Sequence, residues 1–220
     1  MRWVPVAALV VVLVLAGCGG SGAKTTPGTT TAAAGADLLH PATLDAKAPA
    51  TYEARFTTTK GAFVVTVHRA WAPLGADRFY NLVRSGFYDG QRLFRVVPGF
   101  VVQWGISGDP KVAKAWQDAT IPDDPVQHSN APGTITFATA GPDTRTTQVF
   151  VNFGSNGFLD QQGFAPFGVV TSGGAAISAL YSGYGEKPTN AQPQIAAGGE
   201  AYLKKTFPKL DRILTARIVG

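Results

Sequence analysis

Two polar side chains, Arg95 and Gln103, stand out because they lie among apolar residues. They are eight positions apart, on two short β-rich runs around a Pro98-Gly99 turn. An arginine stays charged at physiological pH, and its planar guanidinium can hold two acceptors at once. An arginine on an isolated strand is most often a surface residue in an ion pair. The residues alone therefore leave a catalytic and a structural interpretation open.

Residues for other kinds of chemistry are few. The chain has no Gly-x-Ser-x-Gly nucleophile elbow, no Walker phosphate loop and no His-Glu-x-x-His zinc motif. The neighbouring carboxylates Asp123 and Asp124 are expected to face solvent, and the three histidines are far apart in sequence. A single cysteine excludes an internal disulfide and a cysteine-based zinc site. We expect neither a metal nor a cofactor.

The composition excludes two broad classes of protein. Of the 220 residues, 45% are apolar and 15% are charged, which excludes wholesale disorder. The net charge of +5 comes from 19 basic and 14 acidic residues without a clustered basic stripe, so we expect no nucleic-acid binding. The 26 glycines and 15 prolines indicate a turn-rich β architecture.

The N-terminus has the pattern of an export signal. Arg2 precedes an apolar run from Val4 to Leu15, which is short for a membrane span and typical of a signal peptide. The run ends in Leu-Ala-Gly-Cys at Cys18, which resembles a bacterial lipobox. We therefore predict a signal peptide over residues 1–17, a lipidated Cys18 and an anchor in the cell-envelope membrane, facing away from the cytoplasm. A plain signal peptide with an incidental cysteine is the alternative.

The sequence divides the rest of the chain into a tether and one domain. Residues 19–36 are mostly Gly, Ser, Ala and Thr, and cannot bury enough apolar surface to order themselves. We predict that residues 18–49 comprise the lipidated cysteine and a flexible tether, and that residues 50–220 form a domain. Apolar patterning predicts a helix from Pro73 to Gly86, a second over residues 174–181 and a short third over residues 199–205. Residues 105–132 are predicted to form a long polar loop.

Short β-rich runs predict the rest of the domain. Lys60-Gly61 joins the first two runs as a hairpin. Many short strands with only two clear helices favour a closed antiparallel barrel with helical plugs, because closure removes exposed edges. The predicted strands are Tyr52–Thr59, Phe63–Arg69, Leu93–Val97, Phe100–Trp104, Thr134–Thr139, Gln148–Phe153, Phe167–Val170 and Asp211–Val219.

Three blocks of sequence resemble the signature of the cyclophilin family. Residues 87–103 read FYDGQRLFRVVPGFVVQ, and residues 137–151 read FATAGPDTRTTQVFV. The third block is FLD at residues 158–160, followed by PFGVV at residues 166–170. The blocks occur in the family's order and spacing, and the resemblance covers residues 52–219. It implies a mainly β fold, a closed eight-stranded antiparallel barrel capped by two helices, here with an extra short helix near the C-terminus.

The resemblance also implies an activity and its residues. It implies peptidyl-prolyl cis–trans isomerisation, with Arg95 as the catalytic cation and Gln103 as a catalytic partner that reaches the substrate backbone or orients Arg95. A glutamine at the barrel mouth that bonds only main chain is the structural alternative for Gln103. Substrate-binding positions by the same resemblance are Phe100, Val101, Ala138, Thr139, Gln148, Phe150, Phe158, Leu159 and Phe164.

Four positions depart from the family pattern. Phe94 replaces a histidine, Val101 a methionine, Phe158 a tryptophan and Phe164 a pocket histidine. Because Phe158 has no indole N–H to donate, we expect weak binding of cyclosporin.

These features predict an isomerase that assists the folding of exported proteins outside the cytoplasm. Its partners would be unfolded or proline-containing polypeptides and, through the lipid anchor, the membrane. We expect it to act as a monomer. Two alternatives stay open, a non-catalytic peptide-binding chaperone or scaffold on the same fold and a purely structural envelope lipoprotein. A protein that binds proline peptides without turning them over would be the chaperone or scaffold. A protein that neither binds nor turns over such peptides would be the structural lipoprotein.

Overall fold

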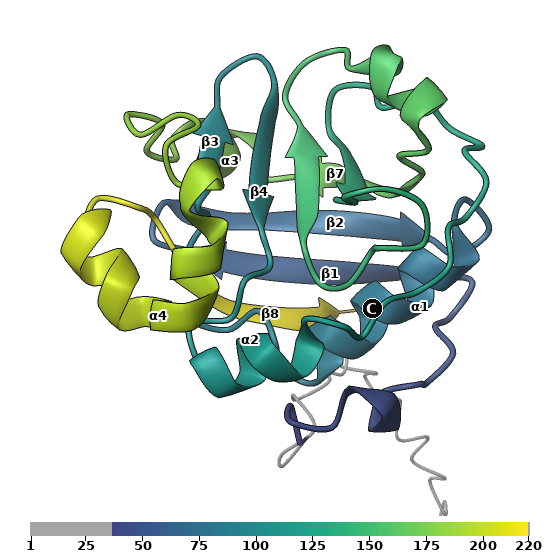
Figure 1. The fold of residues 1–220 in the computed structure, drawn as a ribbon. Coiled ribbons are helices and arrows are strands. Elements are labelled where there is room, and N and C mark those ends of the chain that lie inside the picture. The colour runs from purple at the N-terminus through teal and green to yellow at the C-terminus, as the bar shows by residue number, and fades with distance from the viewer. Residues whose placement is uncertain (1–36, 220) are drawn as a thin grey trace, which may run out of the picture.

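An antiparallel sheet of eight strands dominates the computed structural model, which describes residues 37–219 (Figure 1). The predicted signal peptide, Cys18 and residues 19–36 of the predicted tether lie outside the described residues. The strand positions predicted from the sequence are confirmed to within a few residues. The strands are β1 (Thr51–Thr58), β2 (Gly61–His68), β3 (Arg95–Val97), β4 (Val101–Trp104), β5 (Thr134–Phe137), β6 (Val149–Asn152), β7 (Pro166–Ser172) and β8 (Ile213–Val219).

The sheet curls strongly but does not close, so the predicted closed barrel is wrong. The strand order is β3-β4-β6-β5-β7-β2-β1-β8, which leaves β3 and β8 as edges. The segments that precede β3 and β8 are joined by one isolated antiparallel β-bridge, between Arg92 and Arg212. The strand β3 has three residues and forms no ladder with β8, and Phe94 just before it packs in a separate apolar cluster with residues of the C-terminal part of the chain. Irregular register between β1 and β8, β2 and β7, and β5 and β7 supplies the curl.

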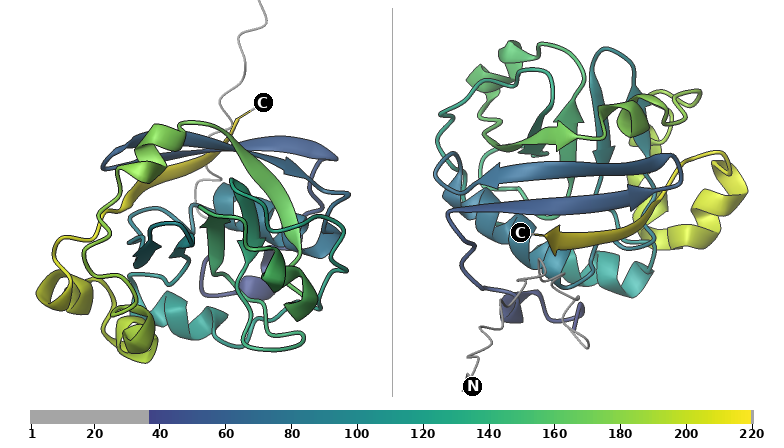
Figure 2. Two further views of the ribbon diagram at one scale, coloured as in Figure 1. Left: turned by 90° about the horizontal axis from the view of Figure 1, so that it is seen from above. Right: turned by 180° about the vertical axis from the view of Figure 1, so that it is seen from behind.

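Residues 37–219 contain four α-helices. The helix α1 (Pro73–Arg84) lies under the sheet beside β8 and buries Ala76, Phe79 and Leu82 (Figures 1 and 2). The helix α3 (Gly174–Ser178) is shorter than predicted, and α4 (Gln192–Thr206) is longer, with a break at Gly199. None of the helices among residues 37–219 is long and apolar enough to cross a membrane.

The helix α2 (Pro110–Trp116) lies inside the segment predicted as a polar loop. Asp109 caps it by accepting a hydrogen bond from the Lys111 N–H at 2.8 Å, and Pro110 occupies the first turn. This Asp-Pro pair is a recognised start signal for a helix. The helix is short because its only buried side chains are Val112 and Trp116.

The domain begins before the boundary predicted at residue 50. The part of the chain that the structure describes also has three short 3₁₀ helices, η1 (Pro41–Thr43), η2 (Gly157–Gln162) and η3 (Thr189–Ala191). The Leu38 carbonyl accepts a hydrogen bond from the Trp116 indole at 2.9 Å, and the Ala48 N–H donates to Asp77 at 2.8 Å. Residues 38–48 are therefore part of the packed domain, not of a flexible tether.

Two of the three apolar clusters among residues 37–219 hold these layers together. The larger fills the concave side of the sheet with rings in mutual contact, among them Phe56, Phe79 and Trp104. The smaller joins α4 to the edge of the sheet beside β3. It consists of Phe94, Ile106, Ile195, Leu203, Phe207 and Leu210. The second cluster fixes α4 next to the strand that carries Arg95.

Candidate active site

Arg95 and Gln103 face each other across the hairpin of β3 and β4. The two residues are register partners, and the Pro98-Gly99 turn between the strands has Gly99 at a φ of 75°. The Arg95 Nη1 donates to Gln103 Oε1 at 3.0 Å. The spacing of eight residues therefore places both side chains at one point on the sheet.

An aromatic ring supports the guanidinium of Arg95. Its Cζ lies 5.1 Å from the centroid of the Phe100 ring, within cation–π range. The Arg95 side chain is 20% exposed, so its charge is at the edge of the protein and is not fully hydrated. The Arg95 guanidinium is thus held in place by Gln103 and Phe100, next to an apolar surface.

The apolar surface is a pocket of about 240 Å³, whose lining includes Arg95 and Gln103. The strands β4 and β6 place Val101 and Phe150 in it, because Phe150 is the register partner of Gln103. The helix η2 and the chain after it add Leu159 and Phe164. Phe100, Ala138 and Thr139 complete the predicted part of the lining. A pocket of this size and character suits a small apolar ring or side chain.

A buried amide holds the lower wall of the pocket in place. The Asn130 N–H and Nδ2 donate to Asp160 Oδ1 at 2.9 and 2.7 Å, and Nδ2 also donates to the Phe164 carbonyl at 2.8 Å. Burial by itself raises the pKa of Asp160, but hydrogen bonds from Ser129 and Asn130 outweigh it and lower this pKa below its usual value. Asp160 therefore stays ionised and ties η2, with Leu159, to the sheet.

Two predicted site residues lie outside this pocket. Gln148 is behind Gln103 and accepts from its Nε2 at 2.8 Å. Gln148 lines a larger cleft of about 500 Å³ between α2 and α4. Phe158 is 56% exposed and stacks on the outer side of Phe100 at 6.1 Å between centroids. The other nine predicted residues all line the 240 Å³ pocket.

Three residues at the site were missed from the sequence, Glu186, Thr189 and Gln192. All come from residues 181–208, to which the sequence assigns no role. Glu186 Oε1 accepts from Arg95 Nη2 at 2.7 Å, and Gln192 Oε1 accepts from Gln148 Nε2 at 2.9 Å. Thr189 and Gln192 line the pocket. No local pattern marks these residues, because they follow Arg95 by more than 90 positions and reach it only through the apolar cluster that joins Phe94 to α4.

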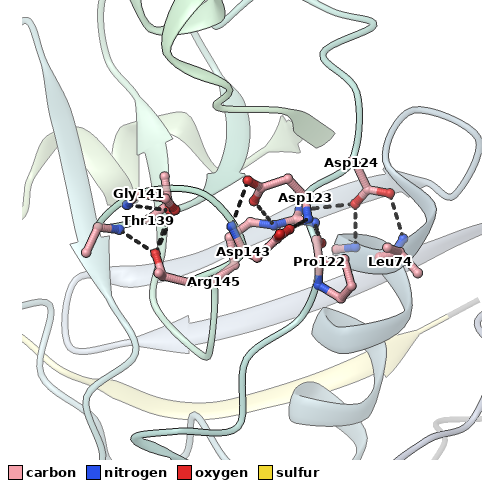
Figure 3. Close-up of polar contacts among 11 residues, drawn as sticks. Leu74, Pro122, Asp123, Asp124, Thr139, Gly141, Asp143 and Arg145 are labelled. Atoms are coloured by element: carbon pink, nitrogen blue, oxygen red, sulfur yellow. Dashed lines mark hydrogen bonds and ion pairs between the residues drawn. The ribbon is translucent and has the colours of Figure 1, made fainter.

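A buried arginine, Arg145, anchors the loop between β5 and β6 (Figure 3). The same loop carries Ala138, Thr139 and Gln148. The Arg145 side chain is 2% exposed, and its Nη1 donates to Asp124 Oδ2 at 3.1 Å. Its Nε lies 3.2 Å from Asp123 Oδ1, and its Nη2 donates to the Pro122 carbonyl. Asp123 and Asp143 also exchange backbone N–H to carboxylate bonds.

The network continues to the start of α1, and the expectation that Asp124 faces solvent is wrong. The Asp124 side chain is 3% exposed and accepts from the Leu74 and Gly75 N–H groups at 3.0 and 2.8 Å (Figure 3). The residue before the helix, Ala72, has no side chain to cap it. Asp124 therefore supplies the missing cap from a distant part of the chain, and Arg145 balances its charge.

Comparison with known proteins adds independent evidence. A family described as cyclophilin type peptidyl-prolyl cis-trans isomerase matches residues 54–198. Peptidyl-prolyl cis-trans isomerase A of Dickeya dadantii is 39% identical over 129 residues, which are 53% of this chain and 64% of that protein. The isomerase ppi1 of Schizosaccharomyces pombe is 32% identical over 121 residues, 53% of this chain and 76% of that protein. The chain thus spans less than two thirds of the Dickeya protein.

Solved structures match the fold. A cyclophilin type peptidyl-prolyl cis-trans isomerase of Cryptosporidium parvum superposes with a TM-score of 0.54 at 17% identity, over 77% of this chain and 98% of that one. A structure of the same Cryptosporidium protein in the presence of the dipeptide Ala-Pro gives 0.52 at 18% identity, over 76% and 99%. At this identity the likeness concerns the fold alone.

Proposed function

Because the chain belongs to the family of cyclophilin-type peptidyl-prolyl cis-trans isomerases, we propose that it catalyses rotation about X-Pro bonds in polypeptides. One observation carries the proposal. The guanidinium of Arg95, held by Gln103 and Phe100, stands at the mouth of an apolar pocket of about 240 Å³. A proline ring in the pocket would place its imide bond beside that cation.

The chemistry needs no nucleophile. The barrier to rotation is about 20 kcal/mol because resonance gives the C–N bond partial double-bond character. In the twisted state the prolyl nitrogen regains a lone pair, and a hydrogen-bond donor that meets it stabilises that state more than the ground state. Arg95 would be this donor. Phe150, Val101 and Leu159 would grip the ring so that the bond rotates and the peptide does not.

Gln103 would hold the Arg95 guanidinium in the position where it meets the prolyl nitrogen. We expect Gln103→Leu to lower kcat/KM about tenfold or more, because a hydrogen bond to a charged group contributes about 1.5–3 kcal/mol. The loss should appear in kcat more than in KM. Steady-state kinetics on a proline peptide measures this, with Gln127→Leu as control at an exposed position on the loop before β5. If the two variants keep equal activity, Gln103 does not orient Arg95.

Refolding of a protein whose slow phase is limited by proline isomerisation tests the function and its main alternative together. Such phases last tens of seconds without a catalyst. We expect catalytic amounts of the purified chain to speed the slow phase. A non-catalytic chaperone or scaffold on this fold would bind the unfolded chain and leave the slow phase unchanged or make it slower. That second result would reject the isomerase and favour the alternative.

We further propose that the protein works outside the cytoplasm on exported polypeptides, anchored by a lipid on Cys18. Support for this comes from the sequence, where an apolar run ends in the lipobox-like Leu-Ala-Gly-Cys. Residues 19–36, rich in Gly, Ser, Ala and Thr, would then tether the domain. Unfolded segments emerging at the membrane would be its substrates.

Removal of the acceptor thiol tests the anchor. We expect Cys18→Ser to move the protein, made in a bacterium, from the detergent phase to the aqueous phase on detergent partitioning, because acyl chains contribute about 0.8 kcal/mol per buried methylene. Mass spectrometry of the N-terminal peptide should show acylation in the wild type alone. Ser21→Ala, a change nearby in the predicted tether, is the control. An unmodified Cys18 in the wild type would contradict the proposal.

A further inference from the structure

A turn between α3 and α4 crosses the mouth of the candidate site. We call residues 182–192 the rim segment; Figure 1 shows this part of the chain passing beside β3 on its way to α4. The Gly185 N–H donates to the Ser182 carbonyl at 3.0 Å, and the Lys187 N–H donates to the Tyr184 carbonyl at 3.1 Å. Gly185 has a φ of 53°, a conformation that favours glycine. The turn thus has a defined shape that directs Glu186 toward Arg95.

Aromatic contacts hold the rim segment against the rest of the protein. The Tyr184 ring lies edge-on to Phe207 and to Tyr181, with 5.2 Å between centroids in both pairs. Phe207 belongs to the cluster that fixes α4 beside β3. At the other end, Gln192 bonds to Gln148. The middle of the segment, around Glu186, is attached to the sheet through Arg95.

The Glu186 carboxylate occupies part of Arg95 that a peptide would use. Its Oε1 is 2.7 Å from Arg95 Nη2, while Gln103 takes Nη1. Both terminal nitrogens of the guanidinium therefore have a partner before any substrate arrives. The Glu186 side chain is 49% exposed, so the ion pair is partly hydrated, and such pairs contribute little to stability. A carboxylate held this weakly can be displaced by a ligand.

Two buried polar atoms at the pocket beside the rim segment have no hydrogen-bond partner within the part of the chain that the structure describes. Within residues 37–219, Arg95 Nε and Thr189 Oγ1 are buried and have no hydrogen-bond partner. Both residues line the 240 Å³ pocket. A buried polar group without a partner is costly, and this cost falls if the rim shifts and either atom reaches water or a peptide.

We infer that Glu186 competes with the substrate for Arg95, so that the rim segment restrains the activity of the free protein. This inference rests on the proposed function, because it assumes that Arg95 binds the peptide at the prolyl bond. A peptide must replace the carboxylate at Nη2, and part of its binding free energy is spent on that exchange. The charge of Glu186 also offsets the charge of Arg95 that would meet the prolyl nitrogen.

Removal of the carboxylate should therefore activate the enzyme. We expect Glu186→Gln and Glu186→Ala in the full chain to raise kcat/KM on an Ala-Pro peptide about two- to fivefold, with most of the change in KM. Lys187→Ala is the matched control, since Lys187 is the exposed neighbour and its backbone bond is kept. Added salt should raise the wild-type value toward that of Glu186→Gln, because salt screens an exposed pair.

Each result separates the inference from the function it rests on. An active wild type with unchanged or lower kcat/KM in both Glu186 variants would overturn competition, and a lower value would show that Glu186 positions Arg95. If no variant turns over the peptide, the isomerase proposal fails. Peptide titration followed by NMR then decides the inference, because competition predicts tighter binding to Glu186→Ala than to the wild type, and equal or weaker binding would overturn it.

Discussion

Arg95→Ala is expected to lower kcat/KM on an X-Pro peptide about 100- to 1,000-fold, the usual effect of removing one preorganised donor from a transition state. The substitution removes the Nη1 bond to Gln103 and the cation over the Phe100 ring. Binding of the peptide should weaken less than turnover, because the apolar pocket remains. Steady-state kinetics and a peptide titration measure the two effects separately.

Two further variants make this result specific. Arg95→Lys keeps the charge but loses the planar fork, so it should recover only part of the activity. Arg55→Ala changes an exposed arginine on β1 and should have wild-type activity. Wild-type turnover by Arg95→Ala would remove the cation from the mechanism and leave the pocket without a catalytic group.

Arg145→Met is expected to have the largest effect on folding. Loss of the arginine leaves Asp124, which is almost fully buried, without its charge partner. Breaking a buried pair in this way typically costs about 3–5 kcal/mol in the free energy of unfolding. Asp124 keeps two backbone donors at the start of α1, so we expect a value near 3 kcal/mol, measured by denaturant unfolding.

The control for this prediction removes both halves of the pair. Arg145→Met combined with Asp124→Asn should recover part of the stability, because no unpaired charge is then buried. Arg55→Met, an exposed position, should change the free energy of unfolding by less than about 0.5 kcal/mol. A loss below about 1 kcal/mol for Arg145→Met would show that Asp124 is stabilised by α1 alone.

Local pattern was enough to predict most of the sheet. Alternating burial along β1 and β2, and the turn residues between them, are visible in the sequence itself. Whether the sheet closes into a barrel was not predictable in this way. It depends on whether β3 and β8 meet, and Phe94, just before β3, packs with residues of α4, more than 95 positions later.

The residues of the candidate site also fall into a group that local sequence predicts and a group that it does not. Arg95, Gln103 and Phe150 belong to adjacent strands, so motif and register together predict that they meet. Glu186 and Gln192 reach the site only because an apolar cluster fixes α4 beside β3. Helix α2 could have been found from Asp109-Pro110, a signal hidden by the polar composition around it. Long-range packing, which no local pattern encodes, accounts for the residues that were missed.

The most direct test of the central claim is exchange NMR on a short Ala-Pro peptide with and without the wild-type protein. Uncatalysed exchange between the cis and trans forms takes tens of seconds or more and gives no exchange peaks on the NMR timescale. We predict that substoichiometric protein produces cis–trans exchange peaks and that Arg95→Ala does not. A folded wild-type protein that binds the peptide yet produces no exchange would contradict the claim that this site is an isomerase.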